Sequence, residues 1–172
     1  MSLTIRPITA EILNSDIMSR FLARFDDGFS ENRSLDNAPW RYFPLPHFHF
    51  YAICDSKEMA AVMVTSSHSH NEHLNFLYVD ASRRSAGLGE RLMRHWQTST
   101  SSRLLTIHVK KDLIRTQHFY QSLGFALAPI SSCPSILQPW ITKAKSFAPD
   151  CYKNNVLMWR DLSASTAPHK NG

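Results

Sequence analysis

The sequence has few cysteines and no long apolar run, and these two shortages limit where the protein can work. Cys54, Cys133 and Cys151 are odd in number and far apart, which fits reduced thiols better than a disulfide framework. No stretch approaches the roughly twenty apolar residues that cross a membrane, and the first residues lack the apolar core of a secretory signal. We therefore expect a cytoplasmic protein with no membrane partner.

The sequence also lacks the motifs of two common nucleotide sites. There is no G-x-x-x-x-G-K-[ST] segment and no three-glycine dinucleotide fingerprint, so neither a nucleotide-hydrolysing P-loop nor a dinucleotide site is expected. The net charge is +5, yet Lys and Arg form no block interleaved with aromatics, and we expect no nucleic-acid partner. A polyanionic cofactor would explain the positive balance equally well.

The length and the periodicity of the chain indicate one α/β domain. A chain of 172 residues with 43% hydrophobic residues can bury a core. We predict a single domain over residues 1–162, a disordered tail over 163–172 and an irregular connection over 131–150. The periodicity predicts an α/β fold with a mixed sheet. Expected helices cover residues 9–25, 88–96 and 112–123, and expected strands cover 3–8, 47–54, 58–66, 72–79, 103–109, 125–130 and 155–162.

One segment, residues 74–89 with the sequence LNFLYVDASRRSAGLG, carries the strongest local signal. A run of β-forming residues leads into a turn, and a helical period begins behind the glycines. Gly87 and Gly89 lack a Cβ atom, so an anion can approach the main chain closely. The free N–H groups and the dipole at the start of a helix favour a bound phosphate. A plain strand–helix turn is the competing interpretation.

This segment resembles the GNAT-type N-acetyltransferases, whose motif [Q/R]-x-x-G-x-[G/A] meets the pyrophosphate of acetyl-CoA. Residues 84–89 read R-S-A-G-L-G, and residues 118–125, HFYQSLGF, resemble the family's F-Y-x-x-x-G-F block. Together the two motifs cover residues 74–125. The resemblance implies a GNAT-like, mixed and mostly antiparallel central sheet of about seven strands flanked by helices.

The resemblance also implies how the chain would hold acetyl-CoA, its expected co-substrate. Main-chain N–H groups of Leu77 and Val79 on the central strand would bind the acetyl and pantetheine part. Leu113 stands where the family often has an asparagine that bonds the pantetheine arm, so binding would depend more on the strand and the turn. The pyrophosphate would meet the turn residues Arg84, Ser85, Ala86, Gly87, Leu88 and Gly89.

Two residues are expected to move protons. Tyr120 occupies the family's general-acid position, and its hydroxyl, with a pKa near ~10, stays protonated. His73 is our expected general base, at a position where several members have a catalytic Glu and the arylalkylamine enzymes a histidine. Asn75 replaces the second histidine of those enzymes, a departure that puts a paired-histidine relay in doubt. A packing role for Tyr120 and a strand-capping role for His73 stay open, and Glu72 faces the opposite side unless a bulge reverses it.

The acceptor is expected to be a primary amine, attacked by direct transfer in a ternary complex. In the resembled family, residues 26–46 lie over the acceptor pocket, which makes Trp40 and Tyr42 candidate substrate contacts together with Asn75. These aromatics and Trp140 favour a small, partly apolar amine. Two alternatives stay open, a non-catalytic acyl-CoA-binding module and a protein or peptide N-acetyltransferase. The last strand could pair across two copies, so a homodimer also stays open.

Histidine density suggests a competing metal site. His68, His70 and His73, together with His47 and His49 on a nearby strand, could surround zinc. No Cys, Asp or Glu completes a recognised ligand spacing, however, so we expect no metal.

Overall fold

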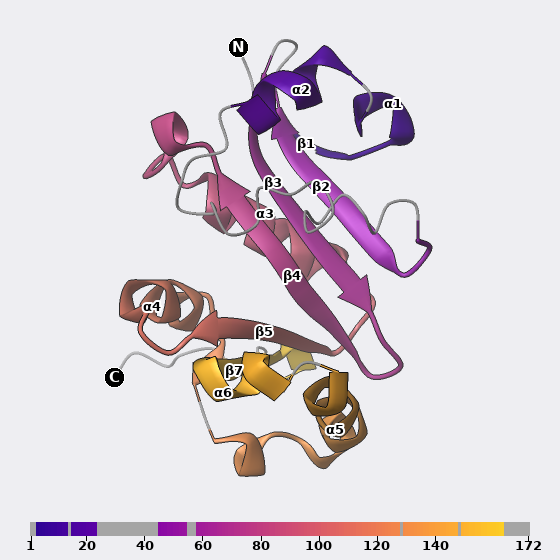
Figure 1. Ribbon diagram of the computed structural model, residues 1–172, viewed down its shortest axis with the longest axis vertical. Helices are drawn as coiled ribbons and strands as arrows, with labels where there is room; N and C mark the ends of the chain where they lie inside the picture. Colours follow the sequence, from indigo (N-terminus) through magenta and orange to yellow (C-terminus); the bar gives the residue numbers. More distant parts are fainter. Residues whose placement is uncertain are drawn as a thin grey trace, which may run out of the picture. The chain divides into compact units, whose positions relative to one another are not determined.

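The computed structural model describes residues 3–13, 15–23, 45–54, 58–127, 129–147 and 149–163 (Figure 1). The chain divides into two compact units, one made of residues 1–67 and 74–96 and the other of residues 68–73 and 97–172. The prediction of one domain over residues 1–162 stays a prediction. The tail from residue 164 onward lies outside the described residues.

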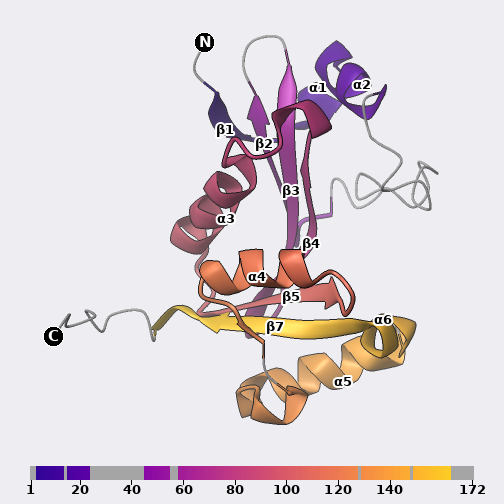
Figure 2. The same ribbon diagram turned by 90° about the vertical axis from the view of Figure 1, so that its left-hand side faces the viewer.

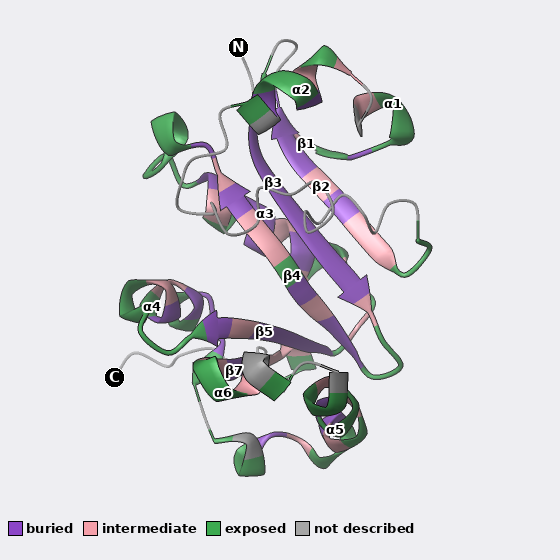
Figure 3. Cartoon of the chain, in the orientation of Figure 1, coloured by how far each residue is buried: buried purple, intermediate pink, exposed green. Residues whose placement is uncertain are grey.

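The first unit is built on antiparallel strands, two of which lie where the sequence predicted strands over residues 47–54 and 58–66. Strand β1 pairs with β2, and β2 pairs with β3 in a register that sets Phe50 opposite Val64. Strand β3 is buried along nearly its whole length (Figure 3). The elements of this unit are β1 (Thr4–Pro7), α1 (Ala10–Leu13), α2 (Asp16–Ala23), β2 (Phe48–Cys54), β3 (Met59–Ser67), most of β4 (Asn71–Val79), the 3₁₀ turn η3 (Ala81–Arg83) and most of α3 (Leu88–Ser99).

The N-terminal helix, expected over residues 9–25, is divided into α1 and α2. Thr9 caps α1, since its hydroxyl accepts a hydrogen bond from the Ile12 N–H at 3.4 Å. Ser15 then interrupts the helix: its hydroxyl donates to the Ile12 carbonyl at 2.6 Å and accepts from the Met18 N–H at 3.4 Å. A serine that bonds the backbone on both sides ends one helix and begins the next. The buried side of α2, with Met18 and Phe21, joins the core of this unit.

The second unit contains the first three residues of β4 and a strand, β7, that pairs antiparallel with both β5 and β6. Helices α5 and α6 lie alongside β7 (Figure 2). Its core joins the strands and α5 through Leu104, Cys133, Leu137, Ile141 and Leu157. The elements are β5 (Leu104–Lys110), α4 (Ile114–Ser122), β6 (Ala126–Leu127), η4 (Ile130–Ser132), η5 (Ser135–Leu137), α5 (Gln138–Phe147), α6 (Pro149–Asn154) and β7 (Asn155–Asp161).

The structure corrects the expected connection over residues 131–150, which is helical. Leu137 and Ile141 lie one turn apart and are fully buried against Leu104 and Leu157, so packing on the strands stabilises a helix there. Pro139 is tolerated because it lies in the first turn of α5. The strand expected over residues 125–130 is also shorter, because a proline, Pro129, cannot donate to a ladder.

The start of α4 differs from the sequence prediction as well. The helix begins at Ile114 and not at residue 112, and its N-cap, Leu113, makes no side-chain cap bond. The turn between β5 and α4 is held instead by Gln117, whose buried amide donates to the carbonyls of Lys110 at 3.1 Å and Lys111 at 3.0 Å. A side chain inside the helix therefore stabilises the turn in place of a capping side chain.

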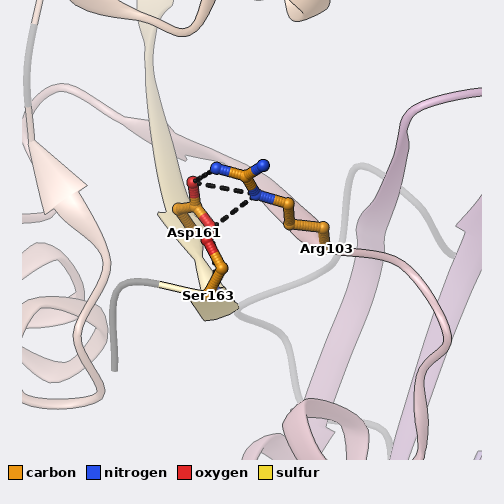
Figure 4. A network of polar contacts seen from close by, with 3 residues as sticks. All are labelled: Arg103, Asp161 and Ser163. Carbon is orange, nitrogen blue, oxygen red and sulfur yellow. Dashed lines mark hydrogen bonds and ion pairs between the residues drawn. The ribbon is translucent and has the colours of Figure 1, made fainter. Parts of the chain in front are cut away.

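An ion pair joins the start of β5 to the end of β7 (Figure 4). The Arg103 guanidinium donates to both carboxylate oxygens of Asp161, Nε to Oδ1 at 3.0 Å and Nη2 to Oδ2 at 2.7 Å. The Ser163 hydroxyl donates to Oδ1 at 2.7 Å. These bonds hold the pKa of Asp161 well below its usual range.

The hydrogen-bonded strand order is β1-β2-β3-β4-β5-β7-β6. The chain therefore contains the mixed, seven-stranded sheet with flanking helices that the sequence predicted, and the predicted fold class is confirmed.

Candidate functional site

The turn that follows β4 is anchored by one buried carboxylate, Asp80. The Asp80 N–H donates to the Ala60 carbonyl at 2.9 Å, and its side chain accepts from the Ser82 N–H at 3.0 Å and from the Ser82 hydroxyl at 2.6 Å. These bonds fix the 3₁₀ turn η3 and the direction in which the chain leaves the strand.

Beyond η3 the main chain presents a row of hydrogen-bond donors. Within the described residues, the N–H groups of residues 85–89 donate to no other group of the chain. Ser85 and Gly87 both have positive φ, 66° and 73°, and a backbone that alternates in this way turns successive N–H groups toward one point. These groups lie at the start of the twelve-residue helix α3, whose dipole adds positive potential. The arrangement suits an anion.

Position 87 favours glycine because of its backbone conformation and not because neighbouring atoms crowd it. A Cβ atom built on it would meet nothing within 4 Å, so the space beside it is open to a ligand. Ser85, by contrast, adopts a left-handed conformation without being glycine, at a cost on the order of 1 kcal/mol. Strain of this kind, on an exposed turn, is typical of a ligand-binding loop.

The two arginines of the turn have different partners. Arg84 extends back over the strand, with its Nε 3.4 Å from the Val79 carbonyl and its guanidinium 5.9 Å from the Tyr78 ring centroid. Arg83 forms an exposed ion pair with Glu58 at 3.3 Å, a partner that the sequence did not indicate. Part of the positive charge of Arg83 is therefore offset by Glu58.

The strand residues expected to contact ligands are partly accessible. Leu77 and Val79 are half-buried near the end of β4, and Asn75 is exposed. The Asn75 amide donates to the Ser66 hydroxyl on β3 at 2.8 Å. Trp40 and Tyr42 lie outside the described residues.

The second unit holds a group of five rings, which we call the histidine cluster: His68, His73, His108, Trp140 and Tyr152. The Trp140 ring centroid lies 5.2 Å from that of His73, 5.7 Å from His68 and 6.0 Å from His108. The Tyr152 ring meets His108 edge-on at 4.6 Å. His73 Nδ1 lies 3.0 Å from the Thr106 hydroxyl oxygen.

The cluster favours neutral imidazoles. Burial lowers the pKa of His73 well below its ordinary value, and the charges of His108 and His68 lower it further. Burial also lowers the pKa of His108, to about 4. At neutral pH His73 is therefore in the form that can accept a proton, although its basicity is reduced.

Glu72 lies apart from this cluster, as regular alternation requires. Its buried carboxylate accepts a short hydrogen bond from the Thr100 hydroxyl, whereas its neighbours Asn71 and His73 both contact the Thr106 hydroxyl. The start of β4 thus points His73 and Glu72 to opposite faces.

Tyr120 lies in a buried aromatic environment at the end of α4. Its ring centroid is 5.1 Å from that of Phe119 and 6.1 Å from that of Phe125. Burial raises the pKa of Tyr120 above its ordinary value. The hydroxyl therefore stays protonated at neutral pH and can donate a hydrogen bond or a proton.

Sequence reasoning missed Thr106, His108 and Tyr152. A signal for the first two existed, because alternation over residues 103–109 sets Thr106 and His108 on one face of the strand. Nothing in the sequence paired that face with His73. In the part of the chain that the structure covers, no three His, Cys, Asp or Glu side chains form a group suited to a metal ion. No helix of that part is both long and apolar enough to span a bilayer.

Comparisons with known proteins identify the fold. Residues 46–127 match the family model described as the acetyltransferase (GNAT) domain. No curated protein matches the sequence. Similar solved structures include a GNAT family acetyltransferase from Elizabethkingia anophelis with acetyl-CoA bound, with TM-score 0.60, 16% identity and coverage of 92% of this chain and 97% of that one.

Two further structures show the same likeness. The ribosomal-protein-S18-alanine N-acetyltransferase from Escherichia coli has a TM-score of 0.57 at 16% identity, with 99% of each chain covered. An aminoglycoside 6′-acetyltransferase type Ii has a TM-score of 0.65 at 17% identity, with 92% of this chain and 97% of that chain covered. At such identities the likeness establishes the fold alone. With the family match, it confirms the recognition of the GNAT superfamily made from the sequence.

Proposed function

We propose, from the premise that this chain carries a GNAT acetyltransferase domain, that it moves the acetyl group of acetyl-CoA to a primary amine. The observation that carries the proposal is the row of N–H groups over residues 85–89, which point to no partner within the described chain at the start of α3. A diphosphate is the anion best suited to several converging N–H donors.

The turn and the strand before it would hold the donor. The N–H groups of residues 85–89 and the charge of Arg84 bind the pyrophosphate. The main chain of Leu77 and Val79 binds the acetyl and pantetheine part. Acetyl-CoA supplies a thioester, whose carbonyl carbon is open to attack and whose thiolate is the leaving group.

We assign the proton chemistry to two residues, His73 and Tyr120. His73 takes one proton from the acceptor ammonium, and the resulting amine attacks the carbonyl carbon. The new C–N bond forms, the C–S bond breaks, and Tyr120 gives its proton to the departing sulfur. The nitrogen loses its second proton as the amide forms, which restores Tyr120, and His73 returns its proton to solvent. The products are the acetylated amine, CoA as a thiol and one released proton.

We infer that the acceptor is a small, partly apolar amine and that the protein acts in the cytoplasm. The aromatic character of the histidine cluster supports an apolar part in the acceptor. A second candidate function, a non-catalytic acyl-CoA-binding module, is favoured by the lowered pKa of His73, because a weak base accepts a proton from an ammonium poorly.

Turnover and binding measured together separate the two functions. The purified chain is tested with acetyl-CoA and a panel of arylalkylamines, aliphatic diamines, amino acids and peptides with free N-termini, and acetyl-CoA binding is measured by calorimetry. His73→Gln should lower kcat by about 100-fold and leave acetyl-CoA affinity unchanged. His70→Gln, at an exposed histidine three residues away, is the matched control. Binding without turnover of any amine would establish the module instead.

A further inference from the structure

The hydroxyl of Thr106 lies where three polar groups of β4 meet. Its oxygen is 2.8 Å from Asn71 Nδ2, 3.0 Å from His73 Nδ1 and 3.4 Å from the Glu72 carbonyl oxygen. Thr106 and Asn71 are fully buried. Buried polar groups of this kind form hydrogen bonds with the donors and acceptors that lie within reach.

One assignment of the hydrogens turns all three contacts into hydrogen bonds. A threonine hydroxyl has one hydrogen and two lone pairs, the Asn71 amide nitrogen can only donate, and the Glu72 carbonyl can only accept. When the hydroxyl donates to Glu72 and accepts from Asn71, its remaining lone pair faces His73 Nδ1. That nitrogen must then carry a hydrogen.

The tautomer of the His73 ring follows from this arrangement. In a neutral imidazole with hydrogen on Nδ1, the lone pair is on Nε2.

We propose that Thr106 is a positioning residue that holds His73 in the Nδ1–H tautomer, so that Nε2 is the atom that takes the proton of the acceptor ammonium. This inference rests on the proposed function. The proton passes from the ammonium nitrogen to Nε2, while the Nδ1–H bond to Thr106 is kept in both charge states of the ring. Thr106 itself touches neither substrate in this step.

The other groups around the ring make the tautomer matter. His108 from β5 and His68 before β4 disfavour a charged His73, Trp140 from α5 covers it, and Tyr152 from α6 lies against His108. The resting ring is therefore neutral. A neutral ring in the wrong tautomer presents an N–H where the reaction needs a lone pair.

Nitrogen NMR of the imidazole rings in the unliganded protein tests the tautomer directly. We expect the Nδ1–H form for His73 in the wild type and in Thr106→Ser, and a shift toward Nε2–H in Thr106→Val, which keeps the shape but loses the hydroxyl. In turnover assays, Thr106→Val should lower kcat by about 10- to 100-fold with an unchanged KM for acetyl-CoA, and Thr106→Ser should recover most of that loss.

A merely structural role for Thr106 predicts a different result. Thr106→Val would then lower the melting temperature without changing the tautomer or the pH dependence of kcat. An Nε2–H form of His73 in the wild type overturns the proposal, and this spectrum requires neither a variant nor a substrate. If no amine is acetylated, the proposed function fails, whereas the spectrum still decides whether Thr106 sets the tautomer.

Discussion

The imidazole of His73 lies edge-on to that of His108, with ring centroids 5.0 Å apart and ring planes at 61°. His73 comes from β4 and His108 from β5, both within the second unit. Burial is the main cause of the lowered pKa at each ring, and the charge of His108 adds to the lowering at His73. Protonating both rings would place two like charges together away from water.

This pair should make the fold sensitive to acid. The pKa of His108 is about 4 in the folded chain against the ordinary value of 6.5, so the unfolded chain binds more protons between these values. The free energy of unfolding therefore falls as the pH falls through this window. In the wild type, the free energy of unfolding should fall between pH 7 and pH 5. In His108→Phe this fall should be smaller by about 2 kcal/mol, measured by urea unfolding.

The control for this experiment is a histidine on the surface. His118 is exposed on α4, and His118→Phe should keep the pH dependence of the wild type. Equal losses in His108→Phe and the wild type would show that His108 is not held neutral by the fold.

The glycine turn gives a prediction about affinity. Gly87→Ala has space for its Cβ atom but must adopt φ near 73°, which costs an alanine about 1 kcal/mol or more. Either the turn changes shape or the strain remains, and we expect acetyl-CoA affinity to fall roughly 10-fold by calorimetry. Ser85→Gly, which relieves strain at the neighbouring positive φ, should keep the affinity within about threefold. An unchanged acetyl-CoA affinity in Gly87→Ala would show that the conformation of the turn does not determine acetyl-CoA binding.

Local signals account for the parts of the fold that the sequence predicted. Strands β2 and β3 follow from two runs of β-forming residues on either side of a polar tripeptide, and β4, its turn and α3 follow from a change of period at Gly87. The helices over residues 138–154 were missed for the opposite reason. Their stabilising contacts join Leu137 and Ile141 to Leu104 and Leu157, and no local pattern contains that information.

The same distinction holds for the candidate site. The turn could be located because its glycines and helix start are adjacent in sequence. His73 could be named by position, but its environment depends on residues more than thirty positions away, above all Thr106 and His108. Burial, which lowers the pKa of both histidines, is a property of the packed structure. The proton chemistry assigned to these residues stays a prediction.

The acid role of Tyr120 can be tested through the leaving group. Tyr120→Phe keeps the ring that packs against Phe125 and removes only the proton donor. We expect kcat to fall about 10- to 100-fold with acetyl-CoA, and much less with an acetyl thioester whose thiol has a lower pKa, because that thiolate leaves without a proton. Since burial raises the pKa of Tyr120, the wild-type rate should not decline on the alkaline side until above about pH 10. Equal losses with both thioesters would assign Tyr120 a packing role.

Gly124 ends α4 in a left-handed conformation and also faces a charged side chain. Its φ is 85°, and a Cβ atom there would lie 3.1 Å from Cζ of Arg160, whose Nη1 donates to the neighbouring Leu123 carbonyl. Gly124→Ala therefore meets two penalties, about 1 kcal/mol from the backbone and a contact term of similar size from displacing the guanidinium. We expect the free energy of unfolding to fall by about 2 kcal/mol, measured by urea unfolding.

A double-mutant cycle separates the two penalties. In an Arg160→Ala background the contact term is absent, so Gly124→Ala should destabilise by only about 1 kcal/mol. Gly124→Asn tolerates the left-handed conformation better than alanine does but keeps the Cβ contact, so in the Arg160→Ala background it should approach the stability of the glycine parent. If Gly124→Ala is equally destabilising with and without Arg160, the backbone conformation alone explains why glycine stands at the end of α4.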